Sequence, residues 1–247
     1  MRLDQALVAR GLSRTRSQAR EAILRGAVTV DGTVVTKAAL RVAEDARLQT
    51  AGEAWVSRAA HKLVAALDHY KIDPEGARAL DIGASTGGFT EVLLARGAAE
   101  VIALDVGHDQ LAPNLRADPR IHVIEGLNAR HLTADDLPFA PDLVVSDVSF
   151  ISLKLALPPA LGLAVPGARL VALVKPQFEV GREAIGKGGI VRDAAAADAA
   201  LADVTASITA LGWRLEPAIS SPIEGGDGNR EFLVAGVKTG AAAGVTA

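Results

Sequence analysis

A glycine-containing turn is the first stretch of this sequence whose composition indicates chemistry. The residues DIGASTGGFT, at 81–90, follow an apolar run typical of a strand and precede an amphipathic pattern typical of a helix. Glycines at 83, 87 and 88 permit backbone angles that a side chain would obstruct, and the start of the helix offers free N–H groups. The turn is therefore predicted to let the backbone approach a bound nucleotide closely, although such a turn can also merely connect strand and helix.

Three charged side chains come directly after predicted strands. Asp105 follows an apolar strand and lies 22 positions after Gly83. A carboxylate at this spacing binds the ribose hydroxyls of a dinucleotide or of S-adenosylmethionine, and the alternative is an ordinary surface aspartate. Asp147 and Lys175 follow two later strands. Because functional groups collect at the carboxyl ends of parallel strands, all three are candidate site residues.

Alternating strand and helix patterns run through residues 78–237. The predicted strands lie at 79–82, 100–105, 121–126, 143–146, 170–174, 213–217 and 231–237, and a long helix lies at 193–211. This alternation predicts an α/β fold with a Rossmann-like, mostly parallel sheet of seven strands and helices on both faces. A further helix at 57–69 precedes the first strand and carries Lys62 beside its apolar stripe. Taken alone, this residue would be an ordinary exposed helix lysine.

Composition limits the class of protein. Of the 247 residues, 49% are hydrophobic and 22% are charged, which indicates a globular chain. The absence of cysteine excludes disulfides, thiolate metal sites and a cysteine nucleophile. No segment has the pattern of a signal peptide or of a membrane helix of about 20 apolar residues. We expect a soluble, cytoplasmic monomer with no metal and no membrane contact.

The first fifty residues carry a charge opposite to that of the rest. Residues 1–50 contain nine basic and five acidic side chains, although the whole chain has a net charge of −3. A basic segment on an acidic body is expected of a nucleic-acid-binding appendage, and a solvated helical surface is the alternative. The pattern predicts two helices that end at Gly11 and Gly26, followed by a hairpin with an Asp31-Gly32 turn.

This segment resembles the S4-type RNA-binding domain. The resemblance rests on the RLD opening, the RG before the hairpin and the V-x-V-x-G hairpin, within RLDQALVARGLSRTRSQAREAILRGAVTVDGTVV. It implies contacts to structured RNA, mainly through phosphate and shape. A glycine- and charge-rich loop at 176–192 is interpreted as a mobile flap that could also touch RNA, or as an ordinary surface loop. The candidate RNA-binding residues are Arg2, Arg14, Arg16, Arg20, Arg25, Lys37, Arg182 and Lys187.

The glycine turn matches the dinucleotide fingerprint G-x-G-x-x-G poorly, which argues against hydride chemistry. It resembles instead the first motif of S-adenosylmethionine-dependent methyltransferases. More narrowly, it resembles the FtsJ-like RNA ribose methyltransferases, which carry a G-G pair before an aromatic residue. That family has a catalytic Lys-Asp-Lys-Glu set on the helix before the first strand, after the fourth and fifth strands, and in the last strand. The matching residues are Lys62, Asp147, Lys175 and Glu231.

An S4-type domain joined to an FtsJ-like domain, with the strings SDVSFISL and LVKPQFE, resembles the TlyA family over nearly the whole chain. The resemblance implies S-adenosylmethionine-dependent 2′-O-methylation of a ribose, that of a cytidine, in ribosomal RNA of assembled subunits. Family members are also called haemolysins. A non-catalytic ribosome-binding or assembly factor and a membrane-active protein are the alternatives. The expected divisions are an S4-type domain at 1–52, a linker at 53–57, a methyltransferase domain at 58–238 and a disordered tail at 239–247.

The chemistry of these side chains also suggests roles, which we state as a hypothesis. Lys175 is the expected base or orienting group for the ribose hydroxyl, Lys62 would lower its basicity or help to position it, and the two carboxylates would hold the lysines. An ion-pair network that merely stabilises the sheet edge is the alternative. Carbon methylation through a cysteine adduct is excluded, and the residues after Ser146 lack the Asn/Asp-Pro-Pro motif of exocyclic-amine methylation. The expected cofactor-binding residues are Asp81, Gly83, Ala84, Ser85, Thr86, Gly87, Gly88, Phe89, Asp105, Val106, Leu127, Asn128 and Asp147.

Overall fold

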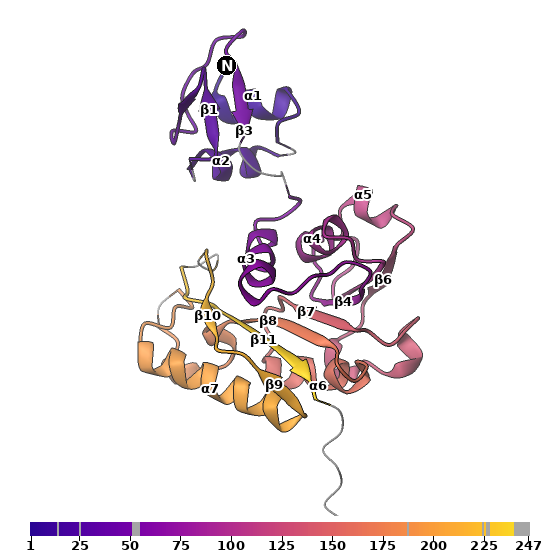
Figure 1. Cartoon of the computed structure of the whole chain (residues 1–247). Helices are drawn as coiled ribbons and strands as arrows, with labels where there is room; N and C mark the ends of the chain where they lie inside the picture. Colours follow the sequence, from indigo (N-terminus) through magenta and orange to yellow (C-terminus); the bar gives the residue numbers. More distant parts are fainter. Residues whose placement is uncertain are drawn as a thin grey trace, which may run out of the picture. The chain divides into compact units, whose positions relative to one another are not determined.

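The computed structural model describes residues 1–13, 15–24, 26–50, 55–186, 188–223, 225 and 228–239, with the main chain alone at Glu21 and Arg182. The chain divides into two compact units, Met1–Arg58 and Ala59–Ala247 (Figure 1). Each unit has its own hydrophobic core and is described by itself. Nearly all of the predicted tail at 239–247 lies outside the described residues.

The amino-terminal unit combines two short helices with a small antiparallel sheet of order β2-β1-β3. Its core is built by apolar side chains that recur on one face of each helix and on the strands, with Leu3, Leu7 and Ile23 completely buried. The elements are α1 (Leu3–Ala9), α2 (Arg16–Leu24), β1 (Val28–Val30), β2 (Thr33–Val34) and β3 (Leu48–Thr50).

The turn between β1 and β2 follows directly from its sequence. Asp31 and Gly32 have φ angles of 51° and 82°, so both occupy the left-handed region. Two consecutive residues of this kind define the turn whose twist matches that of a two-stranded hairpin, and Asp-Gly is among the pairs that adopt it most readily. The predicted hairpin is therefore confirmed, while β3 was not among the predicted strands.

The carboxy-terminal unit is organised around one mixed sheet of order β10-β11-β8-β7-β4-β5-β6. Strands β6, β5, β4, β7 and β8 run parallel, and β11 is antiparallel to β8. The strands are β4 (Arg78–Ile82), β5 (Glu100–Asp105), β6 (Ile121–Glu125), β7 (Leu143–Ser146), β8 (Arg169–Val174), β9 (Trp213–Leu215), β10 (Ile219–Ser220) and β11 (Phe232–Lys238).

The predicted sheet of seven strands is present with its last edge strand in two pieces. Both β9 and β10 pair with β11, at opposite ends of it. Pro217 lies between them and has no N–H to donate, so it interrupts the ladder at this edge.

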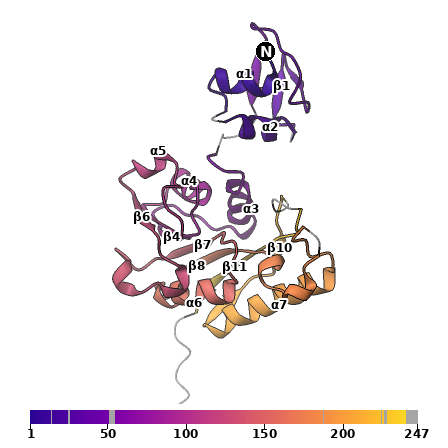
Figure 2. The ribbon, with the colours of Figure 1, turned by 180° about the vertical axis from the view of Figure 1, so that it is seen from behind.

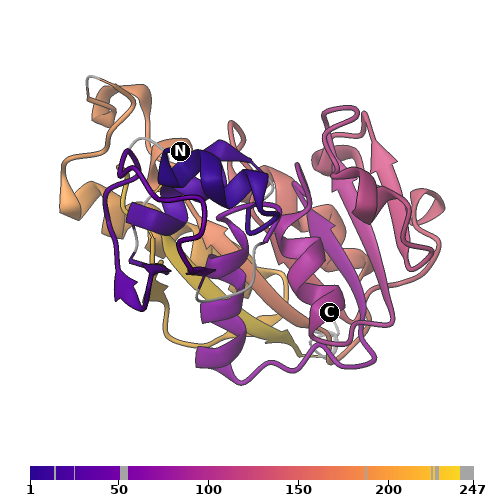
Figure 3. The ribbon, with the colours of Figure 1, turned by 90° about the horizontal axis from the view of Figure 1, so that it is seen from above.

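Helices cover both faces of the sheet. Helices α3 (Ala60–Tyr70) and α4 (Gly88–Ala95) lie on one face, and α6 (Leu153–Leu163) and α7 (Ala194–Ala210) lie on the other (Figures 1 and 2). Figure 3 looks onto the face that carries α3 and α4. A single turn of helix, α5 (Pro113–Arg116), precedes β6. No helix within the described ranges is long and apolar enough to span a bilayer.

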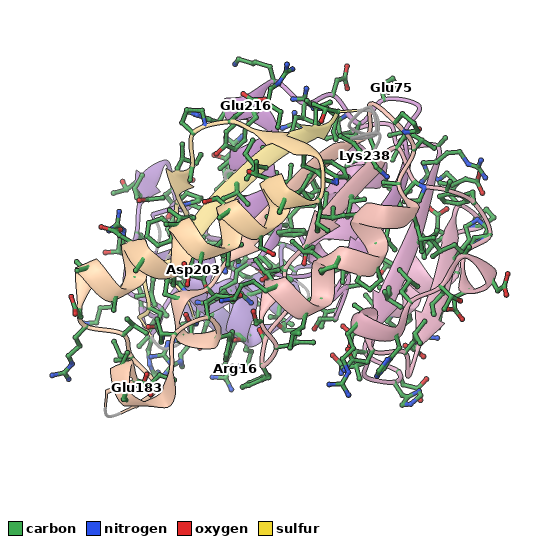
Figure 4. All side chains as sticks on the ribbon, turned by 90° about the horizontal axis from the view of Figure 1, so that it is seen from below. Arg16, Glu75, Glu183, Asp203, Glu216 and Lys238 are labelled. Carbon is green, nitrogen blue, oxygen red and sulfur yellow. The ribbon has the colours of Figure 1, made fainter. Side chains whose placement is uncertain are left out.

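At the end of the sheet away from the glycine turn, polar contacts join β11 to α6. Lys238, the last residue of β11, donates to the carbonyls of Gly162 and Ala164, at 3.0 and 2.7 Å, and so satisfies groups at the end of α6 (Figure 4). Asp203 lies on the exposed surface of α7 in the same view. The chemistry-bearing residues lie at the opposite end, where the parallel strands finish.

Candidate active site

Helix α3 places a lysine inside the protein. Its buried residues are Ala60, Lys62, Leu63, Ala66, Leu67 and Tyr70, which form one stripe at helical spacing. Lys62 belongs to this stripe and is only 5% exposed. An ordinary helix lysine keeps its ammonium group in water, so this position requires a partner.

The partner of Lys62 is Glu231, at the entrance to β11. The Nζ and Oε2 atoms are 2.6 Å apart, and the two side chains are 6% and 2% exposed. Two turns further along α3, the hydroxyl of Tyr70 donates to the carbonyl of Leu233 at 2.9 Å. Helix α3 is therefore fixed to β11 at both of its ends.

A second lysine–carboxylate pair, with Lys175 buried and Asp147 partly buried, joins the ends of β7 and β8. The Nζ atom of Lys175 lies 2.7 Å from Oδ1 of Asp147, and the side chains are 9% and 14% exposed. The same Nζ atom donates to the hydroxyl of Ser149 at 2.8 Å. Each lysine in this region therefore has a carboxylate of its own.

The strand register brings the two pairs together. Phe232 of β11 is opposite Val174 of β8, so the next position in this antiparallel register sets Glu231 opposite Lys175. Directly opposed residues have their Cβ atoms about 5 Å apart on the same face of the sheet. Two lysines and two carboxylates from four separate elements thus form one neutral cluster at the end of the sheet.

The glycine turn lies beside this cluster, and a side chain at Gly83 or Gly87 would be strained and crowded. Gly83 has a φ of 83°, and a Cβ atom there would lie 3.2 Å from the carbonyl oxygen of Asp147. Gly87, with a φ of 97°, is the N-cap of α4, and a Cβ atom there would overlap Leu111 and Leu115. The turn is therefore packed tightly against the strand that ends in Asp147 on one side and against the loop before α5 on the other.

A pocket of about 440 Å³ opens at the ends of β4, β5 and β7. Ligand sites for small molecules and cofactors have volumes of about 300–1,000 Å³. The lining residues are Ile82, Gly83, Ser85, Leu104, Asp105, Val106, Gln110, Leu127, Asn128, Ala129, Asp147, Val148, Ser149, Phe150 and Ile151.

Asp105 is held rigidly at the wall of this pocket. Its Oδ2 atom accepts from the backbone N–H of Ser85 at 2.8 Å, and its Oδ1 atom accepts from that of Gly107 at 2.7 Å. A carboxylate has about four lone-pair directions, so each oxygen keeps capacity for one further donor. The carboxylate is thus oriented and still able to receive two adjacent hydroxyl groups.

Asp81 is a different kind of carboxylate. It is entirely buried below the turn, where its Oδ2 atom accepts from the hydroxyl of Thr90 at 2.7 Å. Its Oδ1 atom has no hydrogen-bond partner among the described residues. Loss of solvation raises the pKa of Asp81 to about 7, and the negative charge of Asp147 adds to this effect.

The predicted cofactor residues divide into two groups. Seven of them line the pocket: Gly83, Ser85, Asp105, Val106, Leu127, Asn128 and Asp147. The other six are not among its lining residues: Asp81, Ala84, Thr86, Gly87, Gly88 and Phe89. Of these, Phe89 and Asp81 are buried in the interior.

Sequence reasoning missed several lining residues, among them Gln110, Ser149 and Phe150. Phe150 is 91% exposed, has a positive φ of 65°, and its ring centroid lies 5.1 Å from that of Phe178. A large apolar ring so exposed beside a pocket offers a face on which a planar ligand can stack. The signal was its position three residues after Asp147, in a loop between a strand end and a helix start.

The candidate RNA-binding residues are described only in part. Arg2, Arg16, Arg20 and Lys37 are exposed on the amino-terminal unit. Buried Asp4 accepts hydrogen bonds from Arg2 and Arg16. The hydrogen bond from Arg2 is the main reason that the pKa of Asp4 is lowered to about 2, and that from Arg16 contributes to it. Arg14, Arg25, Lys187 and the side chain of Arg182 lie outside the described residues.

Comparison with known proteins agrees with this geometry. A family model for FtsJ-like methyltransferases matches residues 55–238, and one for S4 domains matches residues 1–48. The 16S/23S rRNA (cytidine-2′-O)-methyltransferase TlyA of Mycobacterium tuberculosis is 48% identical over 236 residues, which cover 94% of this chain and 88% of that protein.

Solved structures extend the comparison. A Streptococcus thermophilus protein provisionally named a hemolysin is 41% identical, with a TM-score of 0.74 over 97% of this chain and 89% of its own. The N-methyltransferase NodS of Bradyrhizobium japonicum, in complex with S-adenosyl-L-homocysteine, is 15% identical with a TM-score of 0.52 and shares the fold alone. It is matched over 73% of this chain and 86% of its own.

The mixed sheet, the glycine turn and the matching family model define an FtsJ-like methyltransferase preceded by an S4 domain. The chain belongs, more narrowly, to the TlyA family of rRNA methyltransferases, in which some members bear the name hemolysin. The predicted fold class and family are therefore confirmed.

Proposed function

We propose that this protein transfers a methyl group to the 2′-hydroxyl of a ribose, that of a cytidine, in ribosomal RNA. The observation that carries the proposal is the cluster of two lysine–carboxylate pairs, the buried Lys62–Glu231 and the largely buried Lys175–Asp147, beside a nucleotide-sized pocket. Four elements distant in sequence converge to place these charges in the interior. Burying charged groups costs free energy and gives little net stabilisation in return. This arrangement therefore favours a catalytic role for the four residues over a purely structural one.

The pocket suits S-adenosylmethionine as the methyl donor. Asp105 presents two oriented oxygens to the ribose of such a cofactor, and Gly83 leaves the backbone free of a side chain at the pocket wall. Leu127 and Asn128 line the part of the pocket after β6. When bound, the cofactor supplies an electrophilic methyl group on a sulfonium, which needs no metal activation.

The chain must supply what a ribose hydroxyl lacks. A hydroxyl is a weak nucleophile, so a base must take its proton as the new oxygen–carbon bond forms, and the reacting atoms must be held in line. Lys175 is the proposed acceptor of this proton at Nζ, with Asp147 beside it as the counter-charge of the ammonium that results. The Lys62–Glu231 pair holds α3 against β11 and, by the strand register, would border the same hydroxyl from the other side.

The second substrate is structured RNA. Exposed Arg2, Arg16, Arg20 and Lys37 on the S4 domain would contact phosphates, and exposed Phe150 offers a stacking face to the base of the target nucleotide. We further propose that the substrate is an assembled ribosomal subunit, that the enzyme acts as a monomer in the cytoplasm, and that the domains divide near residues 52–58.

Radiolabelled cofactor and purified ribosomal subunits test this function. The full chain should place label in RNA that survives alkaline hydrolysis as a dinucleotide, because a 2′-O-methyl group blocks cleavage at that position. Lys175→Ala should bind S-adenosylmethionine within about threefold of the unaltered protein but lose at least about 100-fold in transfer rate. Lys154→Ala, which removes an exposed lysine on α6, is the matched control and should stay active.

Two outcomes would contradict the proposal separately. If no methyl group is transferred to either subunit, the proposed function is wrong and a non-catalytic assembly factor is favoured. Transfer by Lys175→Ala at near-normal rate would leave the function in place and remove the assignment of the base. The name hemolysin is not favoured as an activity, because it assigns no role to the buried charge cluster or to the pocket.

A further inference from the structure

Ser149 is bonded to the proposed base although no role has been assigned to it. Its hydroxyl oxygen accepts a hydrogen bond of 2.8 Å from Nζ of Lys175, and the residue lines the pocket. Lys175 itself is 8% exposed and is not among the lining residues. Ser149 therefore contacts both the lysine and the pocket.

We infer that Ser149 is a positioning residue for methyl transfer: together with Asp147 it fixes the direction in which Lys175 presents its lone pair. This inference rests on the proposed function. A neutral lysine amine has two N–H bonds and one lone pair arranged about nitrogen. Ser149 Oγ receives one N–H bond at 2.8 Å, and Asp147 Oδ1 lies 2.7 Å from the same nitrogen as its ion-pair partner. With one N–H bond held by Ser149 and the carboxylate of Asp147 beside the nitrogen, the lone pair is directed to the ribose hydroxyl.

The proton and electron balance of the step follows from this arrangement. As the hydroxyl oxygen bonds to the methyl carbon, the carbon–sulfur bond breaks and its electron pair stays on sulfur. The hydroxyl proton passes to the lone pair of Lys175, which becomes an ammonium with three N–H bonds. Ser149 keeps one of these, Asp147 stays beside the ammonium as its counter-charge, and the new N–H bond faces the newly formed ether oxygen. Without Ser149, the amine could rotate about its Cε–Nζ bond and point an N–H at the hydroxyl instead.

An exposed serine can act in this way only if its loop is rigid, and the loop is held at two further points. The carboxylate of Glu179 accepts from the hydroxyl of Ser152 at 2.6 Å and from the N–H of Leu153 at 2.7 Å, where α6 begins. The ring of Phe178 lies against that of Phe150. The segment after β8 thus holds the segment after β7 at successive positions, with the Lys175–Ser149 bond as the first of three contacts.

The experiment compares two substitutions at an exposed position that should leave folding intact. Ser149→Ala removes the acceptor, whereas Ser149→Thr keeps a hydroxyl on the same carbon. Single-turnover methylation of ribosomal subunits should slow about 10- to 100-fold in Ser149→Ala, as expected for a misdirected reacting group. The Michaelis constant for RNA, the dissociation constant for S-adenosylmethionine and the melting temperature should be unchanged. Ser149→Thr should recover at least about a third of the rate, and Ser207→Ala on α7 serves as the control.

A rate for Ser149→Ala within about twofold of the unaltered protein would overturn the inference. So would equal losses in Ser149→Ala and Ser149→Thr, because a hydroxyl would then not be what matters. If the unaltered protein transfers methyl groups while Lys175→Ala does not, these results leave the proposed function intact. If the unaltered protein transfers none, the proposed function fails first and the serine variants are not the cause.

Discussion

The Nζ atom of Lys62 lies 2.6 Å from Oε2 of Glu231, although 169 positions separate the two residues in the chain. Both side chains are almost fully withdrawn from water. The attraction between two such charges offsets the cost of removing them from solvent, but leaves little net stabilisation. Each of them is therefore tolerable only while the other is present.

Removing one member of this pair should be worse for stability than removing both. Glu231→Gln leaves the Lys62 ammonium buried without a counter-charge, which costs about 3–5 kcal/mol of unfolding free energy. The double variant Lys62→Met, Glu231→Leu has no buried charge, so it should be clearly more stable than either single variant while losing methyl transfer. Urea unfolding and the transfer assay measure the two effects.

An exposed pair provides the control for this comparison. Arg96 and Asp68 are 2.9 Å apart with side chains 41% and 56% exposed, so Asp68→Asn should change stability by no more than about 1 kcal/mol. Additive losses in the Lys62–Glu231 double variant would contradict the coupling and would mean that the two charges are stabilised by other neighbours.

Asp105 should control cofactor affinity rather than the chemical step. Hydrogen bonds to a charged group contribute about 1.5–3 kcal/mol each, so Asp105→Ala should weaken S-adenosylmethionine binding about tenfold or more. Asp105→Asn should also bind more weakly, because its single oxygen cannot accept from the N–H groups of both Ser85 and Gly107. Isothermal titration calorimetry measures the dissociation constant.

The control for Asp105 is Asp135→Asn, which changes an exposed aspartate outside the pocket and should bind the cofactor normally. Unchanged affinity in both Asp105 variants would remove this residue from the binding site. A loss of transfer rate at saturating cofactor, with affinity preserved, would instead move Asp105 into the chemical step.

The parts of the fold and site that could be predicted from the sequence are those set by residues close together in the chain. The glycine turn after β4 and the start of α4 were predicted because glycine spacing and an apolar run are local signals. Asp105 was predicted because it lies at the end of a recognisable strand. Helix α6 was not among the predicted elements, and it contains Pro158 and Pro159, which are unusual inside a helix. The burial of Lys62 could not be predicted from its spacing alone. A lysine on the apolar face of a helix is expected to be buried only if a counter-charge such as Glu231 lies opposite it, and the sequence does not show that contact.

Ser149 and Gln110 show the same limit inside the pocket. A serine or a glutamine in a loop has no periodic signal, and its importance comes from which strand ends lie beside it. The register of β8 with β11 and the parallel pairing of β7 with β8 are long-range facts that single-sequence patterns do not contain.

Asp81 should make stability depend on pH in a direction opposite to that of a salt-bridged carboxylate. Its pKa is raised by burial to about 7, whereas an aspartate in the unfolded chain titrates at about 3.9. The unfolded chain therefore releases this proton at lower pH than the native protein does. The resulting contribution favours the native state fully only below about pH 4 and is lost as pH rises to about 7.

Asp81→Asn tests this directly, because asparagine keeps an oxygen for the hydroxyl of Thr90 and cannot ionise. Relative to the unaltered protein, its unfolding free energy should gain about 2–3 kcal/mol more at pH 8 than at pH 5, since each unit of pKa difference corresponds to about 1.4 kcal/mol. Urea unfolding at both pH values measures the change, with Asp135→Asn as the control. A pH-independent difference would show that Asp81 is not held with a raised pKa. If stability rises while cofactor affinity falls, the protein retains a destabilising buried carboxylate for binding, as is expected at a functional site.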